Sequence, residues 1–87
     1  MDNAQILKDF GTTLQHLRKQ KVREDGRPWT QKDLAYEAGV MEPNHISKLE
    51  RGEAEPGLTT LIALAVALDC TLDDLVNIRA LKAARRS

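Results

Sequence analysis

Four polar side chains recur at intervals of three and four residues in the middle of the chain: Asn44, Ser47, Lys48 and Arg51. In a helix this spacing places them on one face, while Ile46, Leu49 and the preceding Val40 can reach a core on the other. An asparagine amide can pair with adenine through two hydrogen bonds, and a lysine ammonium can donate to guanine. The face therefore has the chemistry to bind the edges of bases.

Catalytic and metal-binding patterns are absent from the sequence. His16 and His45 have no cysteine, aspartate or second histidine at metal-ligand spacing. Cys70 lies beside Asp69 with no base nearby in the sequence and is interpreted as a small buried residue. No nucleophile with a base, pair of catalytic carboxylates or phosphate-binding loop stands at a suitable spacing. We therefore expect no enzymatic activity, no cofactor and no bound metal.

Composition predicts one small all-α domain. A chain of 87 residues, with 41% apolar and 30% charged residues, is typical of one soluble domain, and its common residue types favour helix. No secretion signal opens the chain, and its single cysteine cannot form an internal disulfide. The longest apolar run, 61–68, is eight residues, far below the roughly 20 that cross a bilayer. We expect a cytoplasmic protein with no membrane contact.

Charge is balanced overall but unevenly placed. The 13 basic and 13 acidic side chains cancel. Residues 1–23 carry five basic and two acidic groups, whereas residues 24–57 carry four basic and eight acidic ones. A phosphate-binding surface must therefore come from the placement of charge and not from its sum.

The elements that must position these residues are five predicted helices. Thr30, followed three residues later by Asp33, resembles a capping box with a shorter acid and predicts the start of the second helix. Pro43 suits the first turn of the third, and Gly39 and Gly52 suit helix ends. The predicted helices span Ala4–Lys21, Gln31–Ala38, Pro43–Arg51, Leu58–Leu68 and Leu72–Ala84.

Two further segments of the chain carry local signals. Gly11, inside the first helix, indicates close packing against another backbone. The polar stretch from Arg23 to Pro28 predicts an exposed loop. After that loop, two short helices joined by a brief glycine-containing turn have the organisation of a helix-turn-helix unit, between about Thr30 and Gly52.

The chain resembles the Cro and phage-repressor (XRE-type) helix-turn-helix family. Four blocks match in order and cover about three quarters of the chain: FGTTLQHLR, WTQKDLAYEAGV, HISKLERGEAEP and LTTLIALAVALDCTLDDL. The resemblance implies a single domain over residues 1–87. It also implies a compact five-helix bundle of the lambda-repressor type, with the helix-turn-helix formed by the second and third helices.

The resemblance further implies DNA contacts for particular residues. The third helix should enter the major groove of double-stranded DNA, with base edges read by Asn44, Ser47 and Lys48 and, at the margin, His45. Phosphate contacts are implied for Thr30, Gln31 and Arg51. Arg18 and Glu50 match a structural ion pair between the first and third helices.

The chain departs from the family pattern in four places. About six extra residues lengthen the link between the first two helices, and the turn before Ile46 is one residue longer than usual. Pro43 occupies a position that often reads bases, which shifts that role towards Asn44. Glu53 and Glu55 occupy loop positions that are often basic, which weakens the phosphate clamp expected there.

The last two predicted helices, over about 58–84, contain more apolar residues than the core of one domain needs. The additional ones indicate an interface with another chain. Ile62, Val66, Ile78 and Leu81 are predicted to form a twofold interface. A homodimer would place two third helices about one DNA turn apart, roughly 34 Å, on a near-palindromic operator. We thus predict a sequence-specific transcriptional regulator, in particular a repressor. The alternative is an antitoxin or other module that binds a partner protein, which the acidic middle of the chain favours.

Overall fold

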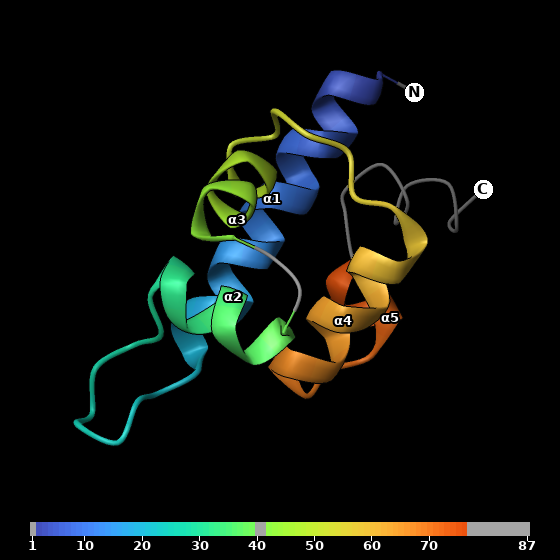
Figure 1. Cartoon of the computed structure of the whole chain (residues 1–87). Coiled ribbons are helices and arrows are strands. Elements are labelled where there is room, and N and C mark those ends of the chain that lie inside the picture. Colours follow the sequence, from blue (N-terminus) through green and yellow to red (C-terminus); the bar gives the residue numbers. More distant parts are fainter. Residues whose placement is uncertain (1, 40–41, 77–87) are drawn as a thin grey trace.

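The computed structural model describes residues 2–39 and 42–76, and these residues form five helices (Figure 1). The expectation of an all-α, five-helix fold is confirmed. In the described residues the one β-type pairing is an isolated bridge between Val22 and Pro28. The helices are α1 Asn3–Gln20, α2 Gln31–Ala38, α3 Pro43–Glu50, α4 Leu58–Leu68 and α5 Leu72–Leu75.

Local capping explains where the two short central helices begin and end. The Thr30 hydroxyl accepts a hydrogen bond from the Asp33 N–H at 3.1 Å, and the Asp33 carboxylate accepts one from the Thr30 N–H at 2.8 Å. Helix α2 ends at Gly39, whose φ of 79° is left-handed. Pro43 stands in the first turn of α3, and Gly52 (φ 74°) follows its end. Because these signals are local, the sequence predicts both helices closely.

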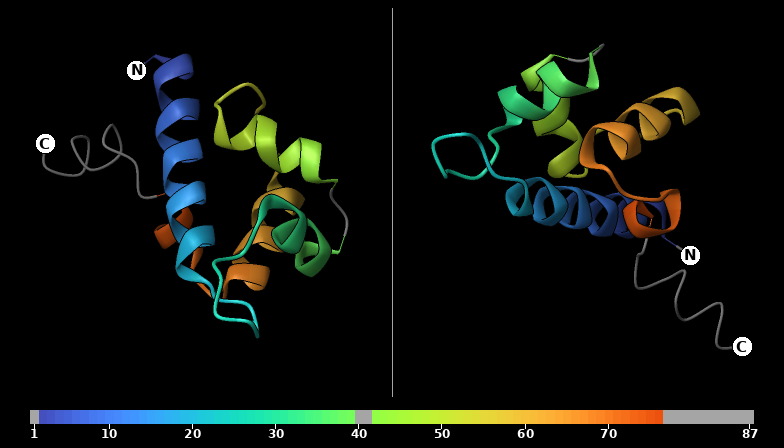
Figure 2. Two further views of the ribbon diagram at one scale, coloured as in Figure 1. Left: turned by 90° about the vertical axis from the view of Figure 1, so that its left-hand side faces the viewer. Right: turned by 90° about the horizontal axis from the view of Figure 1, so that it is seen from below.

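The core is formed where α1 packs against α3 and α5, and α2 packs against α3 and α4 (Figures 1 and 2). Ile46 and Leu49, which the sequence places on the inner face of α3, are fully buried. On the opposite face of α3, Asn44 and Lys48 are exposed. The other buried apolar residues are Phe10, Leu14, Leu34, Ala35, Leu64, Ala65, Leu68 and Leu75.

Gly11 lies where α1 comes close to the backbone of the last turn of α3. A Cβ atom there would lie 2.3 Å from the Glu50 carbonyl oxygen and 2.6 Å from the Leu49 carbonyl oxygen. The close backbone packing expected at this glycine is confirmed, and its partner is the end of α3. A side chain at residue 11 would separate the two helices.

The link between α1 and α2 is a closed hairpin-like loop. The Arg23 N–H donates to the Arg27 carbonyl at 2.7 Å, and the Trp29 N–H donates to the Lys21 carbonyl at 2.9 Å. Gly26 (φ 86°) makes the turn. The additional residues therefore project as a loop and leave the end of α1 beside the start of α2 (Figure 2).

Three expectations lie outside the described residues. These are the continuation of the fifth helix to Ala84, the interface residues Ile78 and Leu81, and the inward position of Val40. On α4, Ile62 and Val66 are 46% and 76% exposed. In the described part of the chain, no helix has the length and apolar character needed to cross a membrane.

Candidate nucleic-acid interface

The open face of α3 brings together the side chains that the sequence selects for base contact. Asn44, His45 and Lys48 are exposed, and Ser47 is half-buried. Within the described residues, Lys48 forms no ion pair, so its ammonium is available to an outside acceptor. An amide, an imidazole, a hydroxyl and an ammonium thus share one surface, which can donate and accept hydrogen bonds.

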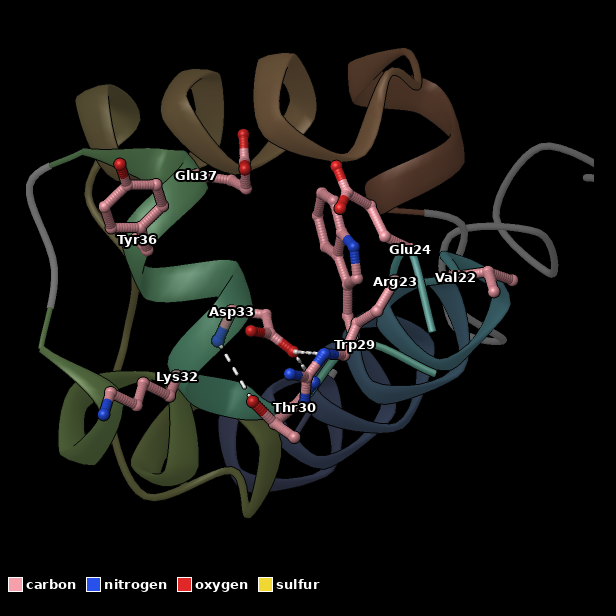
Figure 3. A pocket seen from close by; sticks show the side chains of 9 residues that line it. All are labelled: Val22, Arg23, Glu24, Trp29, Thr30, Lys32, Asp33, Tyr36 and Glu37. Carbon is pink, nitrogen blue, oxygen red and sulfur yellow. Dashed lines mark hydrogen bonds and ion pairs between the residues drawn. The ribbon is translucent and has the colours of Figure 1, made fainter. Parts of the chain in front are cut away.

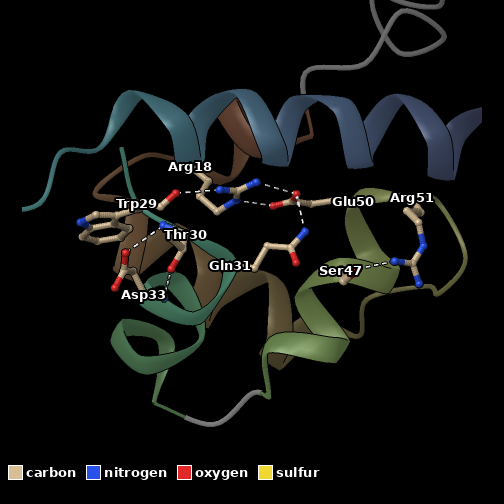
Figure 4. Close-up of polar contacts among 8 residues, drawn as sticks. All are labelled: Arg18, Trp29, Thr30, Gln31, Asp33, Ser47, Glu50 and Arg51. Atoms are coloured by element: carbon tan, nitrogen blue, oxygen red, sulfur yellow. Dashed lines mark hydrogen bonds and ion pairs between the residues drawn. The ribbon is translucent and has the colours of Figure 1, made fainter. Parts of the chain in front are cut away.

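Behind this face, Arg18 fixes α3 against the rest of the fold. Its Nε donates to Glu50 Oε2 at 2.6 Å and its Nη2 donates to Oε1 at 2.9 Å (Figure 4). Its Nη1 donates to the Trp29 carbonyl at 2.7 Å, and the two charged side chains are only 8% and 4% exposed. This bidentate pair joins α1, the end of the loop and α3 in one geometry.

Gln31 belongs to the same network. Its amide Nε2 donates to Glu50 Oε1 at 3.1 Å, so the side chain implied to contact phosphate is bound to Glu50 in the free protein (Figure 4). The link ties α2 directly to α3. A phosphate contact through the side-chain nitrogen would have to share or replace this hydrogen bond.

The capping residues Thr30 and Asp33 take up part of the hydrogen-bonding capacity at the N-terminus of α2. The Thr30 N–H holds the pKa of the Asp33 carboxyl below its usual value, so Asp33 brings a negative charge to this helix end. Among the described residues, no hydrogen bond uses the backbone N–H groups of Gln31 and Lys32. Any anion contact at this end therefore falls to those two groups.

Arg51 is engaged at the other end of the candidate interface. Its Nε donates to Glu53 Oε2 at 2.6 Å, its Nη2 donates to Oε1 at 3.3 Å, and its Nη1 donates to Ser47 Oγ. Hydrogen bonding from Arg51 lowers the pKa of the Glu53 carboxyl. It also raises the pKa of the arginine further above its usual range. The sequence identified Glu53 as an acidic residue in a usually basic place but did not reveal its partner.

His16 has a polar neighbour on α1, and Cys70 is partly buried. In α1, His16 Nε2 lies 3.0 Å from the side-chain amide nitrogen of Gln20. Burial raises the pKa of the Cys70 thiol, which disfavours the reactive thiolate. Across the described ranges, no group of three or more His, Cys, Asp or Glu side chains could hold a metal ion.

An open cleft of about 730 Å³ lies between the loop and α2 (Figure 3). Trp29 and Tyr36 contribute to its lining, and Tyr36 is 82% exposed. Lys21 Nζ lies 5.9 Å from the centre of the Trp29 ring. The cleft could not be predicted from the sequence, because its shape depends on how the loop folds back beside α2.

Comparisons with known proteins agree with this geometry. A family model described as helix-turn-helix matches residues 20–75. Among solved structures, the chain is similar to the restriction-modification controller protein C.AhdI from Aeromonas hydrophila. The two share 30% sequence identity with a TM-score of 0.70, over 79% of this chain and 94% of that one. No curated protein matches the chain.

Proposed function

The chain belongs to the helix-turn-helix family of DNA-binding transcriptional regulators, and we propose that it is a cytoplasmic, homodimeric repressor that reads the major groove with α3. The observation that carries the proposal is the division of α3 into two faces. Ile46 and Leu49 are buried, and the polar residues opposite are open to solvent. A groove about 12 Å wide accepts such a helix.

In this proposal, different side chains supply specificity and position. Asn44 and Lys48, with Ser47 and His45 beside them, contact base edges. The backbone N–H groups at the start of α2 bind a phosphate, which sets the depth of α3 in the groove. The Arg18–Glu50 pair transmits that position to α3, because it holds both helices against α1. Occupying an operator in this way can exclude the transcription machinery.

Removing the Lys48 side chain is the first test of this proposal. On one fixed duplex chosen by selection, Lys48→Ala should weaken binding by about 1–3 kcal/mol, because it removes a base contact. Fluorescence anisotropy at constant salt measures the effect. Lys19→Ala, which removes an exposed lysine from α1, is the matched control. Equal losses for the two variants, on selected and random duplexes alike, would contradict a base-reading role.

The exposed apolar face of α4 supports the homodimer. Ile62 and Val66 belong to a helix whose other side is buried, and a twofold interface would cover them. Placing one α3 in each of two successive major grooves, roughly 34 Å apart, would match a near-palindromic operator.

Val66→Glu should therefore convert a dimer to a monomer and weaken operator binding. A charge buried in an apolar interface without a partner is unfavourable. Sedimentation equilibrium of both proteins measures the change. Val22→Glu is the matched control, because it makes the same substitution at an exposed valine in the loop (60% exposed). This variant should leave the dimer intact. A wild-type protein that is monomeric at high concentration would contradict the dimer.

Two narrower possibilities follow from particular observations. C.AhdI is a restriction-modification controller protein, so genes of a restriction-modification system are candidate targets of this chain.

The cleft beside the exposed Tyr36 favours a second candidate function, in which the same fold binds a partner protein, as an antitoxin does. Co-expression with the product of the adjacent gene, with Tyr36→Ala as the variant, tests this second candidate.

A further inference from the structure

All three nitrogen atoms of the Arg51 guanidinium are engaged within the protein. Nε and Nη2 donate to the two carboxylate oxygens of Glu53. Nη1 donates to the Ser47 hydroxyl (Figure 4). The Arg51 and Glu53 side chains are 51% and 54% exposed, so the pair lies at the surface beside the open face of α3. Arg51 was expected to contact a DNA phosphate, yet the fork formed by its Nε and Nη2 already holds Glu53.

A carboxylate and a phosphate compete for the same two donors of an arginine. Both anions accept parallel hydrogen bonds from the guanidinium fork. For Arg51 to bind a phosphate through Nε and Nη2, it must first release Glu53, because three of its five N–H donors are used and only one on Nη1 and one on Nη2 remain. Otherwise the phosphate must approach a carboxylate of the same sign, which repels it. Either route weakens the phosphate contact that Arg51 could make.

The same arrangement orients Ser47. Its oxygen accepts a hydrogen bond from Arg51, so the hydroxyl hydrogen is left to point elsewhere and can donate to an outside acceptor. Guanine O6 and N7 are acceptors of this kind in the major groove. Holding Arg51 in place therefore favours base contact by Ser47 over phosphate contact by Arg51.

We propose that Glu53 is a specificity-determining residue, which restrains Arg51 from clamping phosphates and so limits binding to non-specific DNA. The inference rests on the proposed DNA-reading function of α3. Affinity for random DNA comes almost wholly from phosphate contacts, whereas affinity for an operator also includes base contacts. Freeing Arg51 strengthens the phosphate contacts that set the affinity for random DNA. It also disturbs Ser47, whose base contact adds to the affinity for an operator. Loss of Glu53 thus narrows the ratio of operator to random affinity.

Glu53→Gln tests the proposal with the full chain on a random-sequence duplex. The variant should bind about two- to fivefold more tightly per protomer at low salt, the range expected for an exposed ion pair. One added phosphate contact should also make the slope of log K against log salt concentration more negative, by up to about 0.9 per protomer. Glu55→Gln is the matched control, because it removes the same charge two residues further along the loop, where no ion pair is formed by the described residues.

Arg51→Ala separates a restraint on Arg51 from a simple effect of negative charge. In the Arg51→Ala background, Glu53→Gln should have no larger effect than Glu55→Gln. The proposal is overturned if Glu53→Gln raises the affinity for random DNA as much with Arg51→Ala as without it. It is also overturned if Glu53→Gln and Glu55→Gln raise that affinity equally in a chain that keeps Arg51. If the wild-type protein fails to bind any duplex at low salt, the proposed function itself fails. Wild-type binding that Glu53→Gln leaves unchanged overturns this inference alone.

Discussion

Gly11→Ala should lower the free energy of unfolding by about 3 kcal/mol or more, because overpacking against rigid atoms is strongly unfavourable. The new methyl group would stand 2.3 Å from the Glu50 carbonyl oxygen and 2.6 Å from that of Leu49. These are backbone atoms that the last turn of α3 holds in place. At an exposed position inside a helix, replacing glycine with alanine would instead stabilise the helix by about 1 kcal/mol. Urea denaturation followed by circular dichroism measures the difference.

Gly57→Ala is the matched control for this experiment. Gly57 precedes α4 with φ −77°, and a Cβ there would meet nothing within 4 Å. We expect a loss of at most about 1 kcal/mol, because Gly57 is the N-cap of α4 and alanine is a poorer N-cap than glycine. A Gly11→Ala protein at least as stable as wild type would show that α1 and α3 are further apart than described.

Glu50→Ala should cost about 3–5 kcal/mol of stability, the usual result of leaving a buried charge without its partner. Arg18 would keep only its hydrogen bond to the Trp29 carbonyl, with its side chain 8% exposed. Gln31 would lose its acceptor as well. Chemical denaturation again gives the free energy of unfolding.

Glu53→Ala provides the contrast, since it removes an equal charge from an exposed pair on the neighbouring loop. We expect little change in stability from it. The double variant Arg18→Met with Glu50→Leu should recover part of the loss, because no buried charge remains unpaired. Similar losses for Glu50→Ala and Glu53→Ala would mean that the Arg18–Glu50 pair is not buried in solution.

These magnitudes matter because a domain of this size has little stability to lose. Natural domains are stable by about 5–15 kcal/mol, and small ones lie at the lower end. Variants at Gly11 and Glu50 would therefore lose DNA binding by unfolding. The side chains chosen to test function, at Lys48, Glu53 and Val66, are exposed and separate the two effects.

The parts of the fold that depend on neighbouring residues could be predicted from the sequence. The Thr30 capping box, the left-handed Gly39 and the early Pro43 each act within one helical turn. They set both ends of α2 and the start of α3. The buried side of α3 followed from the spacing of Ile46 and Leu49.

The rest depends on distances between elements, which spacing along the chain does not supply. Gly11 indicated a close backbone approach but not that the partner was the end of α3. Gln31 was implied to contact phosphate, and only the packing of α2 on α3 brings its amide to Glu50. The Arg51–Glu53 pair is local in sequence, yet it requires one choice among many rotamers of two long side chains.

Selection from randomised duplexes shows whether α3 reads bases. Wild-type protein and Asn44→Ala are carried through the same selection, and the enriched sequences are compared. We expect a near-palindrome for the wild type. For Asn44→Ala we expect a relaxed base preference at one symmetric pair of positions, with the preferences at the other positions retained. No enrichment by the wild type, or the same preferences in both proteins, would contradict the assignment of α3 and Asn44 as the readers.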